Sequence, residues 1–125
     1  MMISVCQSII KNKPYLTEVD SKIGDGDHGI GMSKGMENAM NILRNKRPFS
    51  DINQILKLTG TSMLTSMGGA SGIIFGSMFL GGIKDLECVS QLDKRILEKI
   101  MRKSLDTVKE KGKAKIGDKT MIDAF

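Results

Sequence analysis

The fold is decided in residues 20–43, DSKIGDGDHGIGMSKGMENAMNIL, where an acidic, glycine-rich segment runs into an apolar stripe. The members of the stripe recur every three or four residues and are Met32, Met36, Ala39, Met40 and Leu43. That spacing places them on one face of an α-helix. We expect the helix to begin at His28 and to stop before Arg47-Pro48, because the residue before a proline disfavours the helical conformation.

Helical spacing recurs along the rest of the chain, which contains only two prolines and shows no β alternation. Further helices are predicted over residues 15–22, 50–67, 73–80 and 92–111. Ser50 would cap the helix that follows it, and Gly112 would close the last one. The apolar stretch 73–80 also fits a buried strand, and we choose a helix because its neighbours are helices. The sequence therefore predicts one all-α domain, residues 1–125.

The acidic segment combines three carboxylates, Asp20, Asp25 and Asp27, with His28, the only histidine of the chain. Carboxylates this close repel one another at neutral pH, and a bound cation turns that repulsion into attraction. Hard oxygen ligands favour magnesium or calcium. The segment is therefore a candidate divalent-cation site.

Two familiar loop motifs do not fit this segment. An EF-hand starting at Asp25 needs a glutamate at its twelfth position, which is Met36 here. Gly24, Gly26 and Gly29 match the dinucleotide fingerprint, but the intervening carboxylates would repel a diphosphate unless they carried a metal ion. A solvated acidic turn stays open as the alternative.

Two further glycine-containing segments are candidates for phosphate contacts. Residues 68–72, GGASG, precede the apolar stretch and could bring backbone amides and the Ser71 hydroxyl to a phosphate, although small residues also serve close helix packing. Residues 117–120, GDKT, resemble half of a P-loop but lack its spacing, so a polar turn before a helix is equally open.

Composition argues against nucleic acid and membrane as partners. The net charge is +5, but aromatic residues for stacking are scarce and basic and acidic residues alternate along 93–111, as on a solvated helix face. No apolar run is long enough to span a membrane. Cys6 and Cys88 form no metal or redox spacing, so we expect a reducing, cytoplasmic location.

Three motifs in order resemble the nucleotide-binding L subunit of dihydroxyacetone kinases. They are DSKIGDGDHG at residues 20–29, SMGGASG at 66–72, and GKAKIGDKTM at 112–121. The resemblance implies an antiparallel barrel of eight amphipathic helices, of which this chain would supply roughly the first five. It also implies that ADP or ATP is held with two Mg²⁺ ions at one end of the barrel.

The resemblance also assigns roles to individual residues. Asp20, Asp25 and Asp27 would bind the Mg²⁺ ions. The nucleotide would be contacted by His28, Gly29, Ile30, Gly31, Ala70, Ser71, Gly112 and Met121. Gly112 and Met121 would belong to a lid over the nucleotide, and no catalytic residue is implied beyond the metal site.

The implied function is a kinase subunit that takes part in phosphoryl transfer to dihydroxyacetone or a related ketose. The triose would be held by a separate K subunit, and the phosphate donor would be ATP or a phosphoprotein of the sugar phosphotransferase system. The family continues beyond the position of Phe125, so we expect exposed apolar helix faces, a homodimer or aggregation, and little kinase activity from this chain alone. Gly31 replaces an asparagine that many members have, which suggests another ketose.

Three other functions are weighed against the kinase subunit. The first is a non-catalytic nucleotide-binding or regulatory fragment of the same family. The second is a related two-domain kinase acting on fatty acids, against which the lid sequence GDKTM at 117–121 argues. The third is a plain helical domain with an acidic turn, for which nothing would depend on magnesium.

Overall fold

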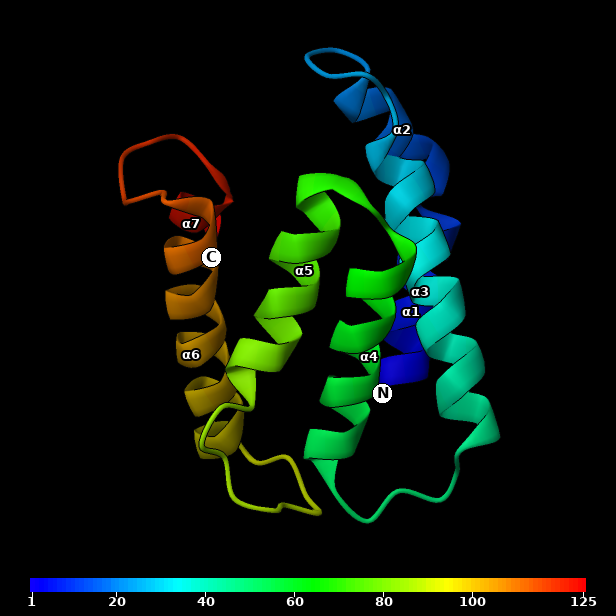
Figure 1. Ribbon diagram of the computed structural model, residues 1–125, viewed down its shortest axis with the longest axis vertical. Helices are drawn as coiled ribbons and strands as arrows, with labels where there is room; N and C mark the ends of the chain where they lie inside the picture. The colour runs from blue at the N-terminus through cyan, green and yellow to red at the C-terminus, as the bar shows by residue number, and fades with distance from the viewer.

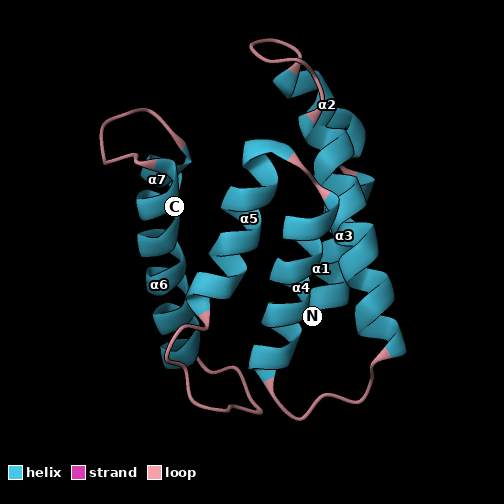
Figure 2. Cartoon of the chain, in the orientation of Figure 1, coloured by secondary structure: helices cyan, strands magenta, loops and turns pink.

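The computed structural model describes residues 1–125 and contains helices but no strand, which confirms the predicted all-α class (Figure 2). The helices are α1 (Met2–Lys11), α2 (Lys13–Asp20), α3 (His28–Asn45), α4 (Ile52–Ser66), α5 (Gly69–Gly82), α6 (Lys94–Gly112) and α7 (Met121–Ala124). There are seven of them rather than five, because the N-terminal apolar run forms α1 and the last residues form α7.

Carboxylates and a hydroxyl cap the starts of three helices. Asp93 Oδ1 accepts a hydrogen bond of 2.7 Å from the Ile96 amide at the start of α6. Asp51, and not the predicted Ser50, caps α4, with its Oδ1 3.0 Å from the Asn53 nitrogen. Thr120 caps α7. The caps therefore explain where these helices begin.

Helices α3 to α6 lie in sequence order and alternate in direction, so that each packs against its neighbour in the chain (Figure 1). Helix α1 packs on α3, and α2 on the start of α3. The loop between α2 and α3 and the loop between α6 and α7 lie at the same end of the molecule, as does the start of α5. None of the helices combines the length and apolar character that crossing a bilayer requires.

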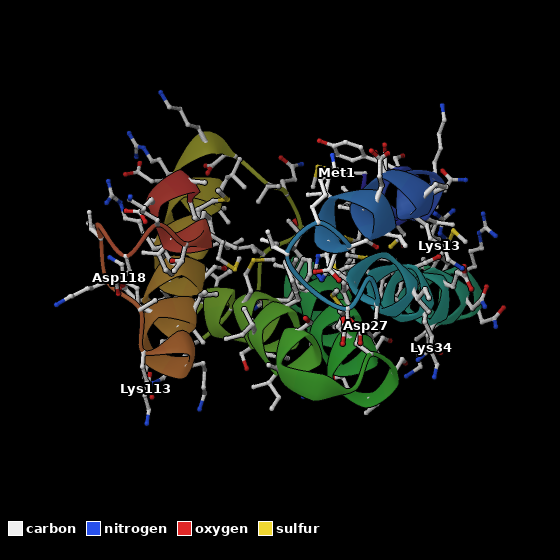
Figure 3. The ribbon with its side chains drawn as sticks, turned by 90° about the horizontal axis from the view of Figure 1, so that it is seen from above. Met1, Lys13, Asp27, Lys34, Lys113 and Asp118 are labelled. Carbon is white, nitrogen blue, oxygen red and sulfur yellow. The ribbon has the colours of Figure 1, made fainter.

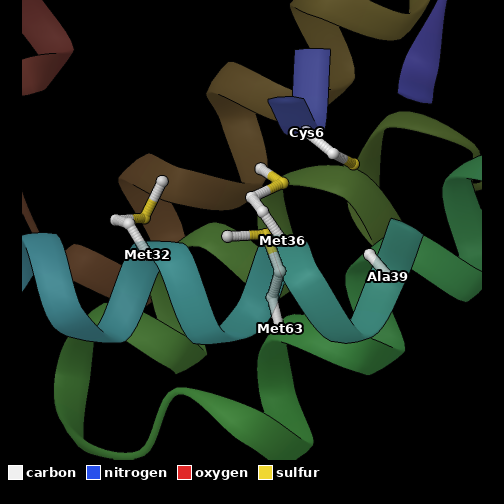
Figure 4. Close-up of a cluster of buried hydrophobic side chains, with 5 residues drawn as sticks. All are labelled: Cys6, Met32, Met36, Ala39 and Met63. Atoms are coloured by element: carbon white, nitrogen blue, oxygen red, sulfur yellow. The ribbon is translucent and has the colours of Figure 1, made fainter. Parts of the chain in front are cut away.

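One cluster of the core consists of sulfur-containing and small side chains between α1, α3 and α4. Its members are Cys6, Met32, Met36, Ala39 and Met63, all of them buried (Figure 4). The predicted stripe on α3 supplies most of this cluster. Methionine is flexible enough to fill the irregular space between packed helices.

Glycines bring α4 and α5 into direct backbone contact. A Cβ on Gly60 would lie 2.8 Å from the carbonyl oxygen of Gly76, and a Cβ on Gly76 would lie 2.9 Å from that of Gly60. The residues of α5 are apolar around most of the helix; Gly72 and Gly76 lie on the face that touches α4, whereas Gly81 and Gly82 lie against α6. This close contact positions the start of α5 beside the start of α3.

Candidate metal and phosphate site

The acidic loop brings its three carboxylates together. Asp20 is the last residue of α2, Asp27 precedes α3, and Asp25 lies between them. One carboxylate oxygen from each lies within 4.8 Å of the others. Asp20 Oδ2 accepts a hydrogen bond of 3.3 Å from the His28 amide, and Asp25 Oδ1 accepts one of 3.3 Å from the Asp27 amide. The loop therefore holds three hard oxygen donors around one point.

Two glycines allow the loop to fold this tightly. Gly26 has a φ of 77°, and a Cβ there would lie 2.5 Å from Ser21 Oγ. A Cβ on Gly24 would lie 2.7 Å from Asp20 Oδ1, against one of the three carboxylates. Side chains at these positions would push the loop away from the end of α2.

Charge repulsion within the cluster changes the pKa of one carboxyl group, that of Asp27. The Asp25 carboxylate, above all, raises the pKa of Asp27 above its ordinary value; partial desolvation, a hydrogen bond with Asp25 and the charge of Asp20 add to this, and His28 opposes it. A divalent cation would relieve this repulsion. The oxygen-only donor set and its spacing fit Mg²⁺, which is usually bound by one or two carboxylates together with water and phosphate oxygens.

The cluster opens into a pocket of about 480 Å³ between the starts of α3 and α5. The pocket is lined by Asp25, Asp27, His28, Ile30, Gly31, Lys34, Met67, Gly68, Gly69, Ala70 and Ser71. Figure 3 looks onto this end of the molecule and labels Asp27 and Lys34. Asp25, Asp27 and the start of α5 thus face the same space, whereas Asp20 does not line it.

The start of α5 has the properties of an anion site. Gly68 is its N-cap, and no side chain caps the helix. Gly68 and Gly69 have φ angles of 71° and 62°, and a Cβ on either would meet nothing within 4 Å. The start of α5 is therefore uncapped and unobstructed at these two glycines, and such helix N-termini can bind phosphate.

A ring contact joins the two walls of the pocket. The centroid of the His28 ring lies 5.7 Å from that of Phe75, with the ring planes inclined by 40°. His28 belongs to the first turn of α3 and Phe75 to the second turn of α5. The contact therefore links the first turn of α3 to the second turn of α5.

Most of the nucleotide residues predicted from the sequence lie at this pocket. His28, Ile30, Gly31, Ala70 and Ser71 line it. Gly29 is buried instead, and a Cβ there would collide with Thr17 and with the backbone carbonyl of Lys13 on α2. Its role in this structure is close packing of α2 on α3.

The two predicted lid residues lie elsewhere at the same end of the molecule. A Cβ on Gly112 would come within 3.7 Å of Ile74 Cδ1, on α5, and neither Gly112 nor Met121 lines the pocket. In Figure 3, Lys113 and Asp118 lie on the far side of α5 from Asp27. The segment from Gly112 to Met121 does not cover the pocket in this structure.

The prediction did not name Lys34 or Met67 as site residues, and it gave Gly68 and Gly69 only as part of the candidate phosphate segment 68–72; all four line the pocket. Lys34 follows His28 and Gly31 at intervals of three residues, and helical periodicity could have placed it on the same face. Met67 and Gly68 connect α4 to α5 and Gly69 begins α5, and only the tertiary fold brings these three residues here.

The fold and the pocket define an all-α protein in which a carboxylate cluster faces an uncapped helix start. A model of one known family, described as the DAK2 domain, matches residues 22–125. The chain belongs to this family.

Similar proteins include DhaL subunits of bacterial kinases. The PTS-dependent dihydroxyacetone kinase, ADP-binding subunit DhaL, of Lactococcus lactis is 37% identical over 119 residues, covering 95% of this chain and 59% of the relative. The PEP-dependent dihydroxyacetone kinase, ADP-binding subunit DhaL, of Escherichia coli is 40% identical over 111 residues, covering 89% and 52%. The chain is therefore of the DhaL type and spans little more than half the length of these relatives.

A longer human relative shares the same region. The triokinase/FMN cyclase of Homo sapiens is 28% identical over 121 residues, covering 97% of this chain and 21% of the relative. The family thus occurs both as separate subunits and as a part of larger chains.

Proposed function

We propose that this chain is the ADP- or ATP-binding subunit of a kinase that phosphorylates dihydroxyacetone or a related ketose. This proposal rests mainly on one observation: the carboxylate cluster shares one pocket with the uncapped start of α5. A metal site beside an anion site is the combination that a magnesium polyphosphate requires. The names of the DhaL relatives support the choice of nucleotide and acceptor.

In this proposal, Asp20, Asp25 and Asp27 hold two Mg²⁺ ions. When bound, Mg²⁺ neutralises phosphate charge and orients the phosphoryl group for transfer. The amides of Ala70 and Ser71 bind phosphate oxygens, while His28 to Gly31 line the nucleotide on the opposite wall. Gly112 and Met121 approach only when the segment that carries them moves over the pocket.

The ketose would be held by a separate K subunit, and ADP could be rephosphorylated by a phosphoprotein of the sugar phosphotransferase system. The words "PTS-dependent" and "PEP-dependent" in the relatives' names support such a donor. We also propose that this chain forms a homodimer. Both cysteines are free, which fits the reducing cytoplasm we propose for the protein.

A non-catalytic nucleotide-binding module is the second candidate. The observation that favours it is the position of Gly112 and Met121 outside the pocket, which leaves the nucleotide open to water. Adding a K subunit, ATP, Mg²⁺ and dihydroxyacetone separates the two candidates. Formation of dihydroxyacetone phosphate supports the kinase, whereas nucleotide binding without turnover supports the module.

The test of the site is ADP binding by calorimetry, with and without Mg²⁺. We expect binding that requires Mg²⁺ and that is lost in Asp25→Asn/Asp27→Asn. The matched control is Asp106→Asn/Glu110→Gln, which removes the same two charges from exposed positions on α6. Equal ADP binding by the wild type and both double variants would refute the proposed site. ADP binding that does not depend on Mg²⁺ would refute it as well.

A further inference from the structure

Lys34 is the only lysine or arginine that lines the pocket. It lies in the second turn of α3, one turn beyond Gly31 and two turns beyond His28, which also line the pocket. Gly68 and Gly69 line it from the connection to α5. Because those glycines carry no side chains, the space between them and α3 is left open to a ligand.

The charge of Lys34 has no partner within the protein. The ion pairs are Lys22–Glu18, Arg102–Glu98 and Lys103–Asp85. Lys34 takes part in none of them and donates no side-chain hydrogen bond. The nearest acidic residue along α3, Glu37, accepts a hydrogen bond of 2.8 Å from Ser33 Oγ instead. The ammonium group is therefore free to pair with a ligand.

A nucleotide in this pocket would need that positive charge. The site already contains three carboxylates, and a nucleoside diphosphate adds several negative charges. Divalent cations at the acidic loop would cancel only part of this negative charge. The amides of α5 contribute only partial positive charges. A lysine is a usual point-charge partner for phosphate.

We propose that Lys34 binds a phosphate group of the nucleoside diphosphate, opposite the start of α5. This inference rests on the proposed nucleotide-binding function. It adds a phosphate contact on α3 to those expected from the metal loop and from α5. Lys34 belongs to none of the three motifs from which the site was first predicted.

The experiment compares ADP affinity at saturating Mg²⁺ for the wild type, Lys34→Gln, Lys34→Arg and Lys99→Gln. Lys99 is exposed on α6 and unpaired, so its substitution makes the same change of charge away from the pocket. We expect Lys34→Gln to weaken ADP binding roughly tenfold, the usual scale for one hydrogen bond to a charged group. Lys34→Arg and Lys99→Gln should bind like the wild type.

The salt dependence of ADP affinity tests the role of the Lys34 charge directly. A merely structural role of Lys34 would not change it. The difference between wild type and Lys34→Gln should shrink as salt is raised, because salt screens an exposed charge pair. Equal ADP affinity of Lys34→Gln and wild type overturns the inference, and so does a loss that Lys34→Arg does not rescue. If the wild type itself binds no ADP, the proposed function fails, and the two failures are thereby distinguished.

Discussion

At the scale of the single residue, Asp123 organises the last turn of the chain. Its Oδ1 accepts a hydrogen bond of 2.7 Å from the Gly117 amide, and its Oδ2 accepts one of 3.1 Å from the Thr120 amide. These backbone hydrogen bonds, with Gly117 the largest contributor, lower the pKa of Asp123 below its ordinary value. The loop and α7 are therefore coupled through one carboxylate.

This coupling predicts a pH dependence of the turn. The folded pKa is lowered, so the stabilisation is fully present above the usual Asp pKa of about 3.9 and is lost as pH falls through the lower folded value. We expect the amide resonances of Gly117 and Thr120 to shift together at that lower pH. Asp123→Asn should abolish the transition, and a shift centred at or above the usual pKa would contradict this account.

The residues of the acidic loop were predictable because they are adjacent in the sequence. Asp20, Asp25 and Asp27 fall within eight residues, and glycines permit the turn that gathers them. The segment 68–72 was predicted as a phosphate contact from its residues, but the position of Met67 to Gly69 beside the acidic loop was not predictable in this way. It reaches the pocket only because α4 and α5 fold back beside α3, which local spacing does not reveal.

At the scale of the element, apolar spacing predicted five of the helices but not α1 or α7, and some helix ends depended on distant partners. Asp51 caps α4 in place of Ser50, and its carboxylate also accepts a hydrogen bond of 3.2 Å from the Val89 amide, beyond α5. No local rule discloses that second partner. Element α5, which the spacing left open between helix and strand, is a helix that packs Gly72 and Gly76 on α4 and Gly81 and Gly82 on α6.

The glycine contact between α4 and α5 leads to a stability prediction. In Gly76→Ala the new Cβ would lie 2.5 Å from Leu64 Cγ and 2.9 Å from the Gly60 carbonyl oxygen. Because the backbone cannot yield cheaply, we expect the free energy of unfolding to fall by about 1–3 kcal/mol, measured by urea denaturation.

The control for this prediction is Gly112→Ala, where the nearest atom would lie 3.7 Å away. That variant should match the wild type or gain up to about 1 kcal/mol, the benefit of alanine over glycine in a helix interior. Equal stability of Gly76→Ala and Gly112→Ala would show that the two helices can separate without cost.

At the scale of the whole molecule, an apolar groove lies between α1, α4, α5 and α6. It has a volume of about 450 Å³, and 13 of its 14 lining residues are hydrophobic. Leu97 and Met101, one turn apart on α6, are 45% and 46% exposed there. Such continuous exposed apolar surface favours binding of apolar molecules and self-association.

We expect Leu97→Lys/Met101→Lys to lower binding of a hydrophobic dye and to reduce self-association in analytical ultracentrifugation. Both positions are partly exposed, so stability should change by less than about 1 kcal/mol. The matched control is Ile23→Lys/Ile116→Lys, which adds the same charge at residues 95% and 76% exposed outside the groove. If the control reduces both signals equally, net charge and not the groove is responsible.

The residues of the metal and phosphate site occupy one continuous run of chain, from Asp20 to Ser71. The helices involved, α3, α4 and α5, each pack on the next one along the chain. Contacts between sequence neighbours close short loops, and such topologies fold quickly. During synthesis, when N-terminal parts fold first, the site can take shape once α5 has left the ribosome, before α6 has emerged. A nascent chain could then bind its ligand cotranslationally.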